Sequence, residues 1–177
     1  MTKLTGEQFI ILYDTYAPKI YRFLLSKTGT VETAQDLTSE TFLKAWNYLQ
    51  KADSGDISRP AAFLFRIARN LTTDYYRARA VRKEIALDDD ALKTLGQTED
   101  KSADISEMTS DKWDMSQIKD ILAKMSRSHP DYADVLILYY VEDVHMAEIA
   151  HIMEKSEGAV RVLIHRALKE LRARIGT

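Results

Sequence analysis

Apolar residues recur at intervals of three and four along most of the chain, which is the period of an amphipathic α-helix. The first such stripe comprises Phe9, Leu12, Tyr13, Tyr16, Ile20, Phe23 and Leu24. Thr5, with Gln8 three positions later, resembles a capping box that begins this helix, and Gly29 is suited to end it. The pattern predicts an N-terminal helix that packs one face against a core.

Two more helices are predicted in the N-terminal half. Thr30 can cap the first of them, whose inward face comprises Ala34, Leu37, Thr41, Ala45 and Tyr48. After a polar loop, "KADSGDIS" at 51–58, Pro60 stands where the first turn of a helix tolerates proline. The next helix turns one face inward, comprising Leu64, Ile67, Ala68, Leu71 and Tyr75, and the opposite face comprises Arg66, Asn70, Thr73 and Arg77.

Four helices are predicted in the C-terminal half, over residues 111–125, 131–143, 145–154 and 155–175. The last two are a short and a long helix separated by a tight turn, which is the shape of a helix-turn-helix. In the long helix an inward stripe comprises Val160, Ile164, Ala167, Leu171 and Ile175, and the outward face comprises Glu157, Arg161, Val162, His165, Arg166 and Lys169. No stretch alternates for long enough to predict a strand, so the expected fold class is all-α.

The distribution of charge divides the chain more sharply than its net charge of -2 suggests. Residues 59–83 carry seven cations and one anion, whereas residues 84–112 carry nine anions and three cations. The acidic segment has few large apolar residues and no sustained period, which is typical of a mobile linker. The sequence therefore predicts two small helical domains, 1–83 and 113–177, joined by an acidic linker at 84–112.

Composition excludes several classes of protein. The chain has no Cys, which excludes disulfides and thiolate metal sites and fits a reducing compartment. The apolar stretch near the N-terminus is far shorter than a membrane span and lacks the pattern of a signal peptide, so we expect a cytoplasmic protein without membrane insertion. Asp36 with Glu40, and Glu148 with His151, lack the further ligands that a carboxylate-bridged metal centre needs. We find no catalytic constellation, and we expect neither enzyme activity nor a cofactor.

Two basic helices carry the candidate chemistry. Ser156 can cap the last helix and leave backbone N–H groups of its first turn for anions, while Arg161 and Arg166 can reach phosphates or guanine edges in a major groove. In the earlier basic helix, arginines are interleaved with aromatic residues, a combination that suits single-stranded or melting DNA. The alternative for either helix is a solvated cationic face over an ordinary core. The short helix packed before the last one favours DNA binding there.

Long stretches of both halves resemble a known family. "YDTYAPKIYRFLLSKTG", "AQDLTSETFLKAW" and "RPAAFLFRIARNLTTDYYR" resemble region two of bacterial sigma factors of the extracytoplasmic-function group, within the sigma-70 family. "DVLILYYVEDVHMAEIAHIMEKSEGAVRVLIHRALKELR" resembles their region four. The resemblance covers both predicted domains in the order of that family. It implies a dissociable subunit that directs core RNA polymerase to promoters and initiates transcription.

The resemblance also implies where each partner binds. The helix matching "AQDLTSETFLKAW" docks in that family on the clamp coiled coil of the β′ subunit, which indicates Asp36, Leu37, Glu40 and Lys44 as polymerase-binding residues. The helix matching "RIARNLTTDYYR", with the loop before it, opens and reads the minus-ten element, which indicates Arg66, Arg69, Asn70 and Arg77. Region four reads the minus-thirty-five element, which indicates Ser156, Glu157, Arg161, His165, Arg166 and Lys169. An anti-sigma protein is a further candidate partner.

The chain departs from the family pattern at several positions. Ser39 stands where the family commonly has Gln, which suggests a different clamp contact. Glu154 and Lys155 occupy the turn of the helix-turn-helix, where Gly and an aliphatic residue are usual; because positive φ is costly for a residue other than Gly, we expect another turn geometry. Three apolar residues replace usually polar or basic ones in the recognition helix: Val162, Leu163 and Leu168. They suit either a thymine methyl group or an anti-sigma protein.

Two other functions remain alternatives at this point. A stand-alone helix-turn-helix regulator would bind duplex DNA without polymerase, and would leave the "AQDLTSETFLKAW" surface without a role. A sigma mimic would titrate an anti-sigma protein and would not need the cations of the two basic helices. The sequence does not indicate the promoter, the regulated genes, the inducing signal or the arrangement of the two domains.

Overall fold

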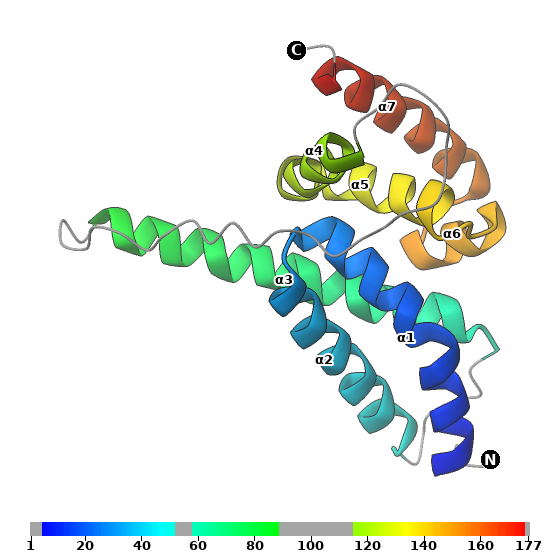
Figure 1. Cartoon of the computed structure of the whole chain (residues 1–177). Coiled ribbons are helices and arrows are strands. Elements are labelled where there is room, and N and C mark those ends of the chain that lie inside the picture. Colours follow the sequence, from blue (N-terminus) through cyan, green and yellow to red (C-terminus); the bar gives the residue numbers. More distant parts are fainter. Residues whose placement is uncertain (1–4, 52–57, 89–114, 176–177) are drawn as a thin grey trace.

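The structure is a computed structural model that describes residues 5–51, 58–88 and 115–175, and its described residues form helices without any strand. The N-terminal group of helices comprises α1 (Gly6–Thr28), α2 (Val31–Leu49) and α3 (Pro60–Asp88). The C-terminal group comprises α4 (Met115–Ser128), α5 (Pro130–Leu136), the π-helical segment η1 (Ile137–Val141), α6 (Met146–Met153) and α7 (Glu157–Ile175). The all-α prediction is confirmed (Figure 1).

The ends of the first helices follow from their sequence, with one exception. Thr5 and Gln8 form the predicted capping box, in which each backbone N–H donates to the other residue's side chain. Gly29 ends α1 in the left-handed region at φ 74°, where a residue without Cβ meets no steric cost. The prediction for Thr30 is wrong in detail, because Thr30 occupies the N-cap of α2 but its side chain makes no capping hydrogen bond.

The predicted inward stripes largely form the core of the N-terminal group. Ile20, Phe23 and Leu24 of α1 are buried, as are Ala34, Leu37, Thr41 and Ala45 of α2 and Leu64, Ala68 and Leu71 of α3. Tyr13 and Tyr48 are exposed instead, near the far ends of α1 and α2. Tyr13 still packs edge-to-face on Phe42, with 4.6 Å between ring centroids.

The C-terminal group contains the predicted helix-turn-helix. The predicted helix at 131–143 is divided, since α5 passes into η1 at Ile137 and the helical segment ends at Val141. Val160, Ile164 and Ala167 of α7 are buried against the other helices, and Leu171 and Ile175 are partly buried. The inward face of α7 is therefore the predicted one.

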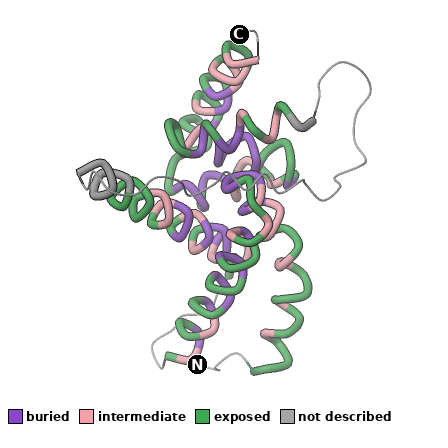
Figure 2. Tube along the Cα trace, turned by 60° about the vertical axis from the view of Figure 1, so that its left-hand side comes forward, coloured by how far each residue is buried: buried purple, intermediate pink, exposed green. Residues whose placement is uncertain are grey.

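The two groups pack against each other and share one apolar core. Helix α3 contacts α6, and α1 contacts α4 and η1. Buried apolar residues of both groups belong to a single cluster, and Figure 2 shows the buried positions gathered where the groups meet. The C-terminal part of α3 extends away from this contact and is exposed as far as Arg82 (Figure 1).

Two sequence predictions fall mainly outside the described residues. Residues 84–88 of the predicted acidic linker continue α3, and the remainder up to 112 lies outside the described part of the chain. Most of the loop at 51–58, predicted to contribute to DNA opening, also lies outside it.

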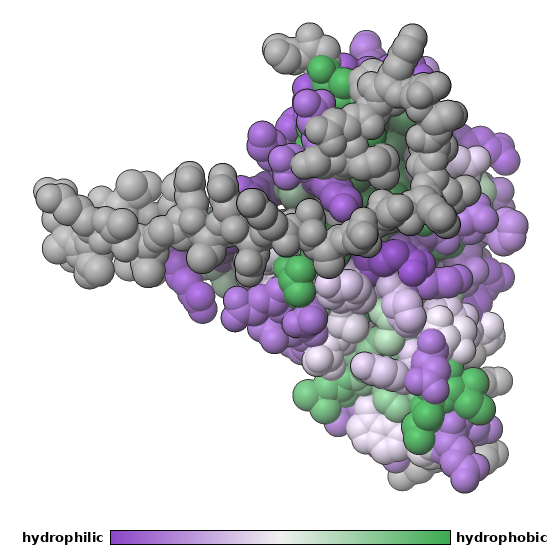
Figure 3. Space-filling model, viewed as in Figure 1, coloured by the Kyte–Doolittle hydropathy of each residue, from purple (hydrophilic) through white to green (hydrophobic). Residues whose placement is uncertain are grey.

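The exposed surface is mixed in character. Figure 3 shows hydrophobic surface toward the end of the molecule where α1 begins and α2 ends, and mostly hydrophilic surface over the C-terminal group. Large exposed apolar residues on α1 and α2 include Ile10, Ile11 and Leu43. Among the described residues, no helix has both the length and the apolar character needed to cross a membrane.

Candidate nucleic-acid and protein interfaces

The outward face of α7 presents the predicted DNA-binding side chains to solvent. Glu157, Arg161, His165, Arg166 and Lys169 are all exposed, and the apolar Val162 lies among them with half of its surface accessible. The Oγ of Ser156 accepts a hydrogen bond from the Ala159 N–H at 3.2 Å, so Ser156 caps α7 as predicted. This face combines two arginines with a capped helix N-terminus, the arrangement that enters a major groove in helix-turn-helix proteins.

The turn before α7 keeps a left-handed residue despite lacking glycine. Glu154 adopts φ 55° and ψ 42° at the C-cap of α6, and its N–H donates to the carbonyls at the end of that helix. Lys155 donates its N–H to the Ala150 carbonyl at 3.0 Å. We expected another turn geometry because the turn lacks glycine, and for the C-cap this expectation is wrong. Hydrogen bonds at the end of α6 hold Glu154 in the left-handed conformation.

The outward face of α2 presents three of the four predicted polymerase-binding residues. Asp36, Glu40 and Lys44 are exposed, and the Lys44 ammonium lies 3.3 Å from the Glu40 carboxylate. Leu37 is buried in the core and does not belong to that surface. Ser39 is exposed next to them, and its hydroxyl donates to the Gln35 carbonyl within the same helix. Leu43 is also exposed and adds an apolar contact surface that the sequence analysis did not single out.

The predicted DNA-binding residues of α3 differ in how accessible they are. Arg66, Asn70 and Arg77 are exposed, and Arg66 also contacts the C-terminal group. Arg69 is partly buried against that group. Arg66 donates to the His151 carbonyl at 3.1 Å, and its guanidinium lies 3.4 Å from the Glu154 carboxylate. The Arg69 side chain is only 22% exposed. The face that the sequence assigns to DNA is thus partly occupied by groups from the helix-turn-helix side of the chain.

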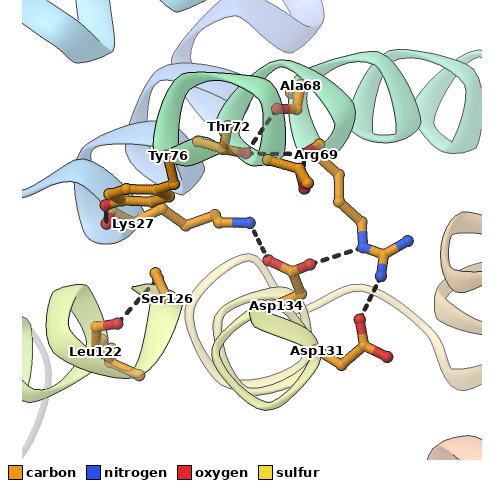
Figure 4. Close-up of polar contacts among 10 residues, drawn as sticks. Lys27, Ala68, Arg69, Thr72, Tyr76, Leu122, Ser126, Asp131 and Asp134 are labelled. Atoms are coloured by element: carbon orange, nitrogen blue, oxygen red, sulfur yellow. Dashed lines mark hydrogen bonds and ion pairs between the residues drawn. The ribbon is translucent and has the colours of Figure 1, made fainter. Parts of the chain in front are cut away.

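A cluster of charged residues, here called the Asp134 cluster and comprising Lys27, Arg69, Asp131 and Asp134, joins the two groups (Figure 4). The Lys27 ammonium pairs with one carboxylate oxygen of Asp134, and the Arg69 Nε donates to the other at 2.7 Å. Arg69 also pairs with Asp131. The Lys27 and Asp134 side chains are each 1% exposed, so both charges depend on these partners for the solvation that water no longer supplies.

The electrostatics of the Asp134 cluster favour a charged Arg69. Burial of the guanidinium lowers its pKa, but the charges and hydrogen bonds of Asp134 and Asp131 together outweigh burial, and the pKa of Arg69 is raised. Tyr76, which donates its hydroxyl to the Lys27 carbonyl, lies beside the cluster in Figure 4. Burial raises the pKa of Tyr76 against the opposing effect of Arg127, whose guanidinium lies over the Tyr76 ring from α4.

A second ion pair joins the groups at the end of η1. The Arg22 Nε and Nη2 donate to the two carboxylate oxygens of Glu142, at 3.1 and 2.8 Å. Glu142 is buried, and desolvation raises its pKa against the opposing effects of Arg22 and Lys19. Neither this pair nor the Asp134 cluster could be predicted from the sequence, because the partners lie far apart in the chain and no local spacing relates them.

The comparisons with known proteins agree with the division into two groups. Residues 12–82 match the family model described as Sigma-70 region 2, and residues 117–171 match the model described as Sigma-70, region 4. The chain is 33% identical over 163 residues to the ECF RNA polymerase sigma factor SigM of Bacillus subtilis, covering 92% of this chain and 91% of the relative. The chain belongs to the ECF group of the sigma-70 family.

Other relatives place this sigma factor in the same group. It is 30% identical to the ECF RNA polymerase sigma factor SigW of Bacillus subtilis, over 96% of this chain and 91% of that one. It also shares its fold with the sigma factor RpoE of Bartonella quintana, solved in complex with the anti-sigma factor NepR, with a TM-score of 0.65, 23% identity and coverage of 97% and 98%. The chain is thus an RNA polymerase sigma factor, as the sequence analysis predicted.

The described part of the sigma factor contains no group of three or more His, Asp or Glu residues arranged to bind a metal ion. Glu148 is partly buried and His151 is exposed on α6, where the His151 carbonyl serves Arg66.

Proposed function

We propose that this sigma factor distributes promoter recognition and polymerase binding over three helix faces. The exposed face of α7 reads the minus-thirty-five element, α3 with the loop before it opens and reads the minus-ten element, and α2 docks on the β′ clamp coiled coil of core RNA polymerase. The protein acts by docking and DNA readout, and catalysis belongs to the polymerase.

The observation that carries the proposal is the outward face of α7. Arg161, Arg166 and Lys169 stand on one exposed helix face behind a serine cap, while Val160, Ile164 and Ala167 fix the opposite face in the core. Because a helix anchored in this way presents its N-terminal turns rigidly, its arginines can address base edges as well as phosphates. Val162 lies on the same face and suits contact with a thymine methyl group.

The polymerase contact rests on the face of α2. Asp36, Glu40 and Lys44 are exposed in successive turns, and Leu43 adds an apolar side chain beside them. Charged groups around an apolar residue are typical of a protein interface with a polar rim. We assign the clamp contact to this face, without the buried Leu37.

The minus-ten contact rests on the basic face of α3. Arg66, Asn70 and Arg77 follow one another along that face, and Arg69 lies beside it. Cationic side chains in such a row can contact successive phosphates of a DNA backbone, and an amide can hydrogen-bond to an unstacked base. Asn70 and Arg77 are exposed and accessible to DNA in this structure. Arg66 is exposed but pairs with Glu154, and Arg69 pairs with Asp131 and Asp134.

The experiment is transcription by core bacterial RNA polymerase on a pool of random promoter fragments, with and without the chain, followed by sequencing of transcript starts. We expect starts that require the chain and share two spaced upstream elements. Arg161→Ala should relax preference at one position of the upstream element and cost about 1–3 kcal/mol there. Arg172→Ala, an exposed arginine near the end of α7, is the matched control and should leave the preference unchanged.

Two results would contradict the proposal. Binding to core polymerase without any chain-dependent starts would favour a sigma mimic. Failure to bind core polymerase, combined with tight duplex binding, would favour a stand-alone helix-turn-helix regulator. Charge reversal of Glu40 should weaken binding to core polymerase, with the same substitution of the exposed Glu7 on α1 as the control.

A further inference from the structure

We propose that Val162 of α7 reads one pyrimidine C5-methyl group in the major groove, so that this sigma factor prefers thymine or 5-methylcytosine to unmethylated cytosine at one position of the upstream element. The inference rests on the proposed role of the outward face of α7 at the minus-thirty-five element. Promoter recognition would then respond to methylation of a cytosine at that position.

Val162 is the exposed one of the three apolar residues that depart from the family pattern in α7. Half of its surface is accessible, whereas Leu163 and Leu168 are partly buried and pack against the apolar core. A single valine is far smaller than the exposed apolar patches, of several hundred square ångströms, that mark protein-docking sites. The exposed apolar group of this face therefore fits a small apolar group of a ligand rather than another protein.

Cationic side chains surround Val162 on the outward face. Arg161 directly precedes it, Arg166 follows it by one helical turn, and both are exposed. The face therefore complements a ligand that carries negative charge on either side of an apolar group. A DNA major groove has this arrangement, because phosphates line it and the thymine methyl group is the apolar group on its floor. The ligand that fits is duplex DNA with a methyl group opposite Val162.

Gly158 lies one helical turn before Val162 and leaves the backbone bare there. Side chains of a helix lean toward its N-terminus, so the Val162 side chain lies over position 158. A Cβ placed on Gly158 would lie 4.0 Å from the Ser156 Oγ in otherwise open space, and Gly158 lacks the positive φ that favours glycine. Neither packing nor backbone conformation requires glycine there. The bare turn lets the helix approach base edges closely enough for a short valine to reach them.

A valine side chain detects the methyl group and no other feature of the base. Thymine and 5-methylcytosine carry a methyl group at C5, whereas uracil and cytosine do not. Because valine has no hydrogen-bonding group, it cannot pair with the thymine O4 or with the cytosine amino group. Burial of one methyl group changes affinity by about fourfold. Preference at this position should therefore follow the methyl group.

Replacement of single thymines by deoxyuridine tests the methyl contact without any change in the protein. The upstream element selected with core bacterial RNA polymerase and the full chain is synthesised with each thymine of either strand replaced in turn, and the affinity of the holoenzyme is measured. We expect about a fourfold loss at one thymine. Cytosine at that position should also bind more weakly, and 5-methylcytosine should bind about fourfold more tightly than cytosine. An element without any methyl-dependent position would overturn the proposal.

Val162→Ala tests whether Val162 makes the contact. The variant should bind the thymine and deoxyuridine duplexes equally, because alanine is too short to reach the methyl group. Val141→Ala, at an exposed valine of η1, is the matched control and should keep the fourfold difference. An undiminished difference in Val162→Ala would overturn the assignment. Absence of any chain-dependent upstream element would overturn the proposed function and the inference together, whereas an element without methyl dependence would overturn the inference alone.

Gly158→Ala tests the close approach of the helix. The added methyl group enters open space and alanine favours a helix over glycine, so the thermal unfolding temperature should not fall. Affinity for the selected duplex should nevertheless fall severalfold, and the preference for thymine over deoxyuridine should shrink. Gly6→Ala, which also adds a methyl group in open space at the start of α1, is the matched control and should leave affinity unchanged. Unchanged affinity in Gly158→Ala would overturn the close approach.

Discussion

The basic faces of α3 and α7 have similar composition but very different surroundings. In α7 the side chains of Arg161 and Glu157 are both exposed, and they form an ion pair within the helix at 3.7 Å. In α3 the side chain of Arg69 is mostly buried between Asp131 and Asp134, and Arg66 is held by the end of α6. The α7 face is exposed to solvent, whereas on α3 two arginines are engaged within the chain and Asn70 and Arg77 remain exposed.

The comparison shows that whether a cationic side chain is free to bind DNA depends on the groups with which it already pairs in the protein. Exposed ion pairs contribute little, about 0–1 kcal/mol, and are readily exchanged for phosphate contacts. A buried pair has already lost its hydration. The net cost of separating it is therefore the small difference between the attraction that is lost and the hydration or DNA contact that is regained. The Asp134 cluster can therefore hold the two helical groups together and still separate at a modest net cost.

The largest effect is expected from Asp134→Ala. The substitution leaves Lys27 and Arg69 as neighbouring cations without a carboxylate between them, which should weaken the contact between the two helical groups by about 3–5 kcal/mol. The chain should then expand, and its radius of gyration in X-ray scattering should rise. Asp120→Ala, with the same change of net charge, should leave the radius unchanged. An equally compact Asp134→Ala variant would show that the apolar contact alone holds the groups together.

The same variant should change how the free chain binds single-stranded DNA. Release of Arg66 and Arg69 should add two cations to the binding surface and steepen the dependence of log affinity on log salt by about 1.4. The measurement is fluorescence anisotropy with a labelled random-sequence oligonucleotide at several salt concentrations, and Asp120→Ala again controls for net charge. An unchanged slope would mean that these arginines do not reach DNA even when free.

Arg166→Ala should have the same effect whether or not the two helical groups are in contact. Because Arg166 is exposed on α7, its loss should weaken binding to the selected upstream duplex by about 1–3 kcal/mol, whether or not Asp134 is present. Additivity of the two substitutions in a double-mutant cycle is the expected result. A coupling energy well above about 0.5 kcal/mol would show that the contact between the two helical groups also restricts the α7 face.

A smaller, pH-dependent effect is expected at Glu142. Burial raises the pKa of Glu142 above its ordinary value of 4.5, so the folded state binds this proton more tightly than the unfolded state. Its contribution to stability is fully present below that ordinary value and decreases as pH rises through the raised pKa. Glu142→Gln should remove this part of the decrease. Urea unfolding across this pH range compares the two proteins, and identical pH profiles would contradict the assignment.

Local features of the fold could be predicted from the sequence because short-range rules decide them. The capping box at Thr5, the left-handed end at Gly29 and the exposed face of α7 all follow from spacings of a few residues. The turn at Glu154 could not be predicted in this way, because the usual preference for glycine is overridden by hydrogen bonds at the end of α6.

The availability of the candidate site could not be predicted, because it depends on contacts between distant parts of the chain. Arg69 and Asp134 are separated by 65 positions, and Lys27 and Asp134 by 107. Leu37 shows the converse: the resemblance implies that it lies at an interface, whereas its helical position buries it in the core. Periodicity decides which face is inward, whereas tertiary contacts decide which outward residues remain free.

The most direct test of the account is the distance between spin labels on cysteines introduced at Thr30 and Lys124, exposed positions next to the contact between Gly29 and Ala123. The account predicts a single short distance in the free chain and a longer one after core RNA polymerase and promoter DNA are added. A long or broad distribution in the free chain, or an unchanged short distance in a transcribing complex, would contradict it.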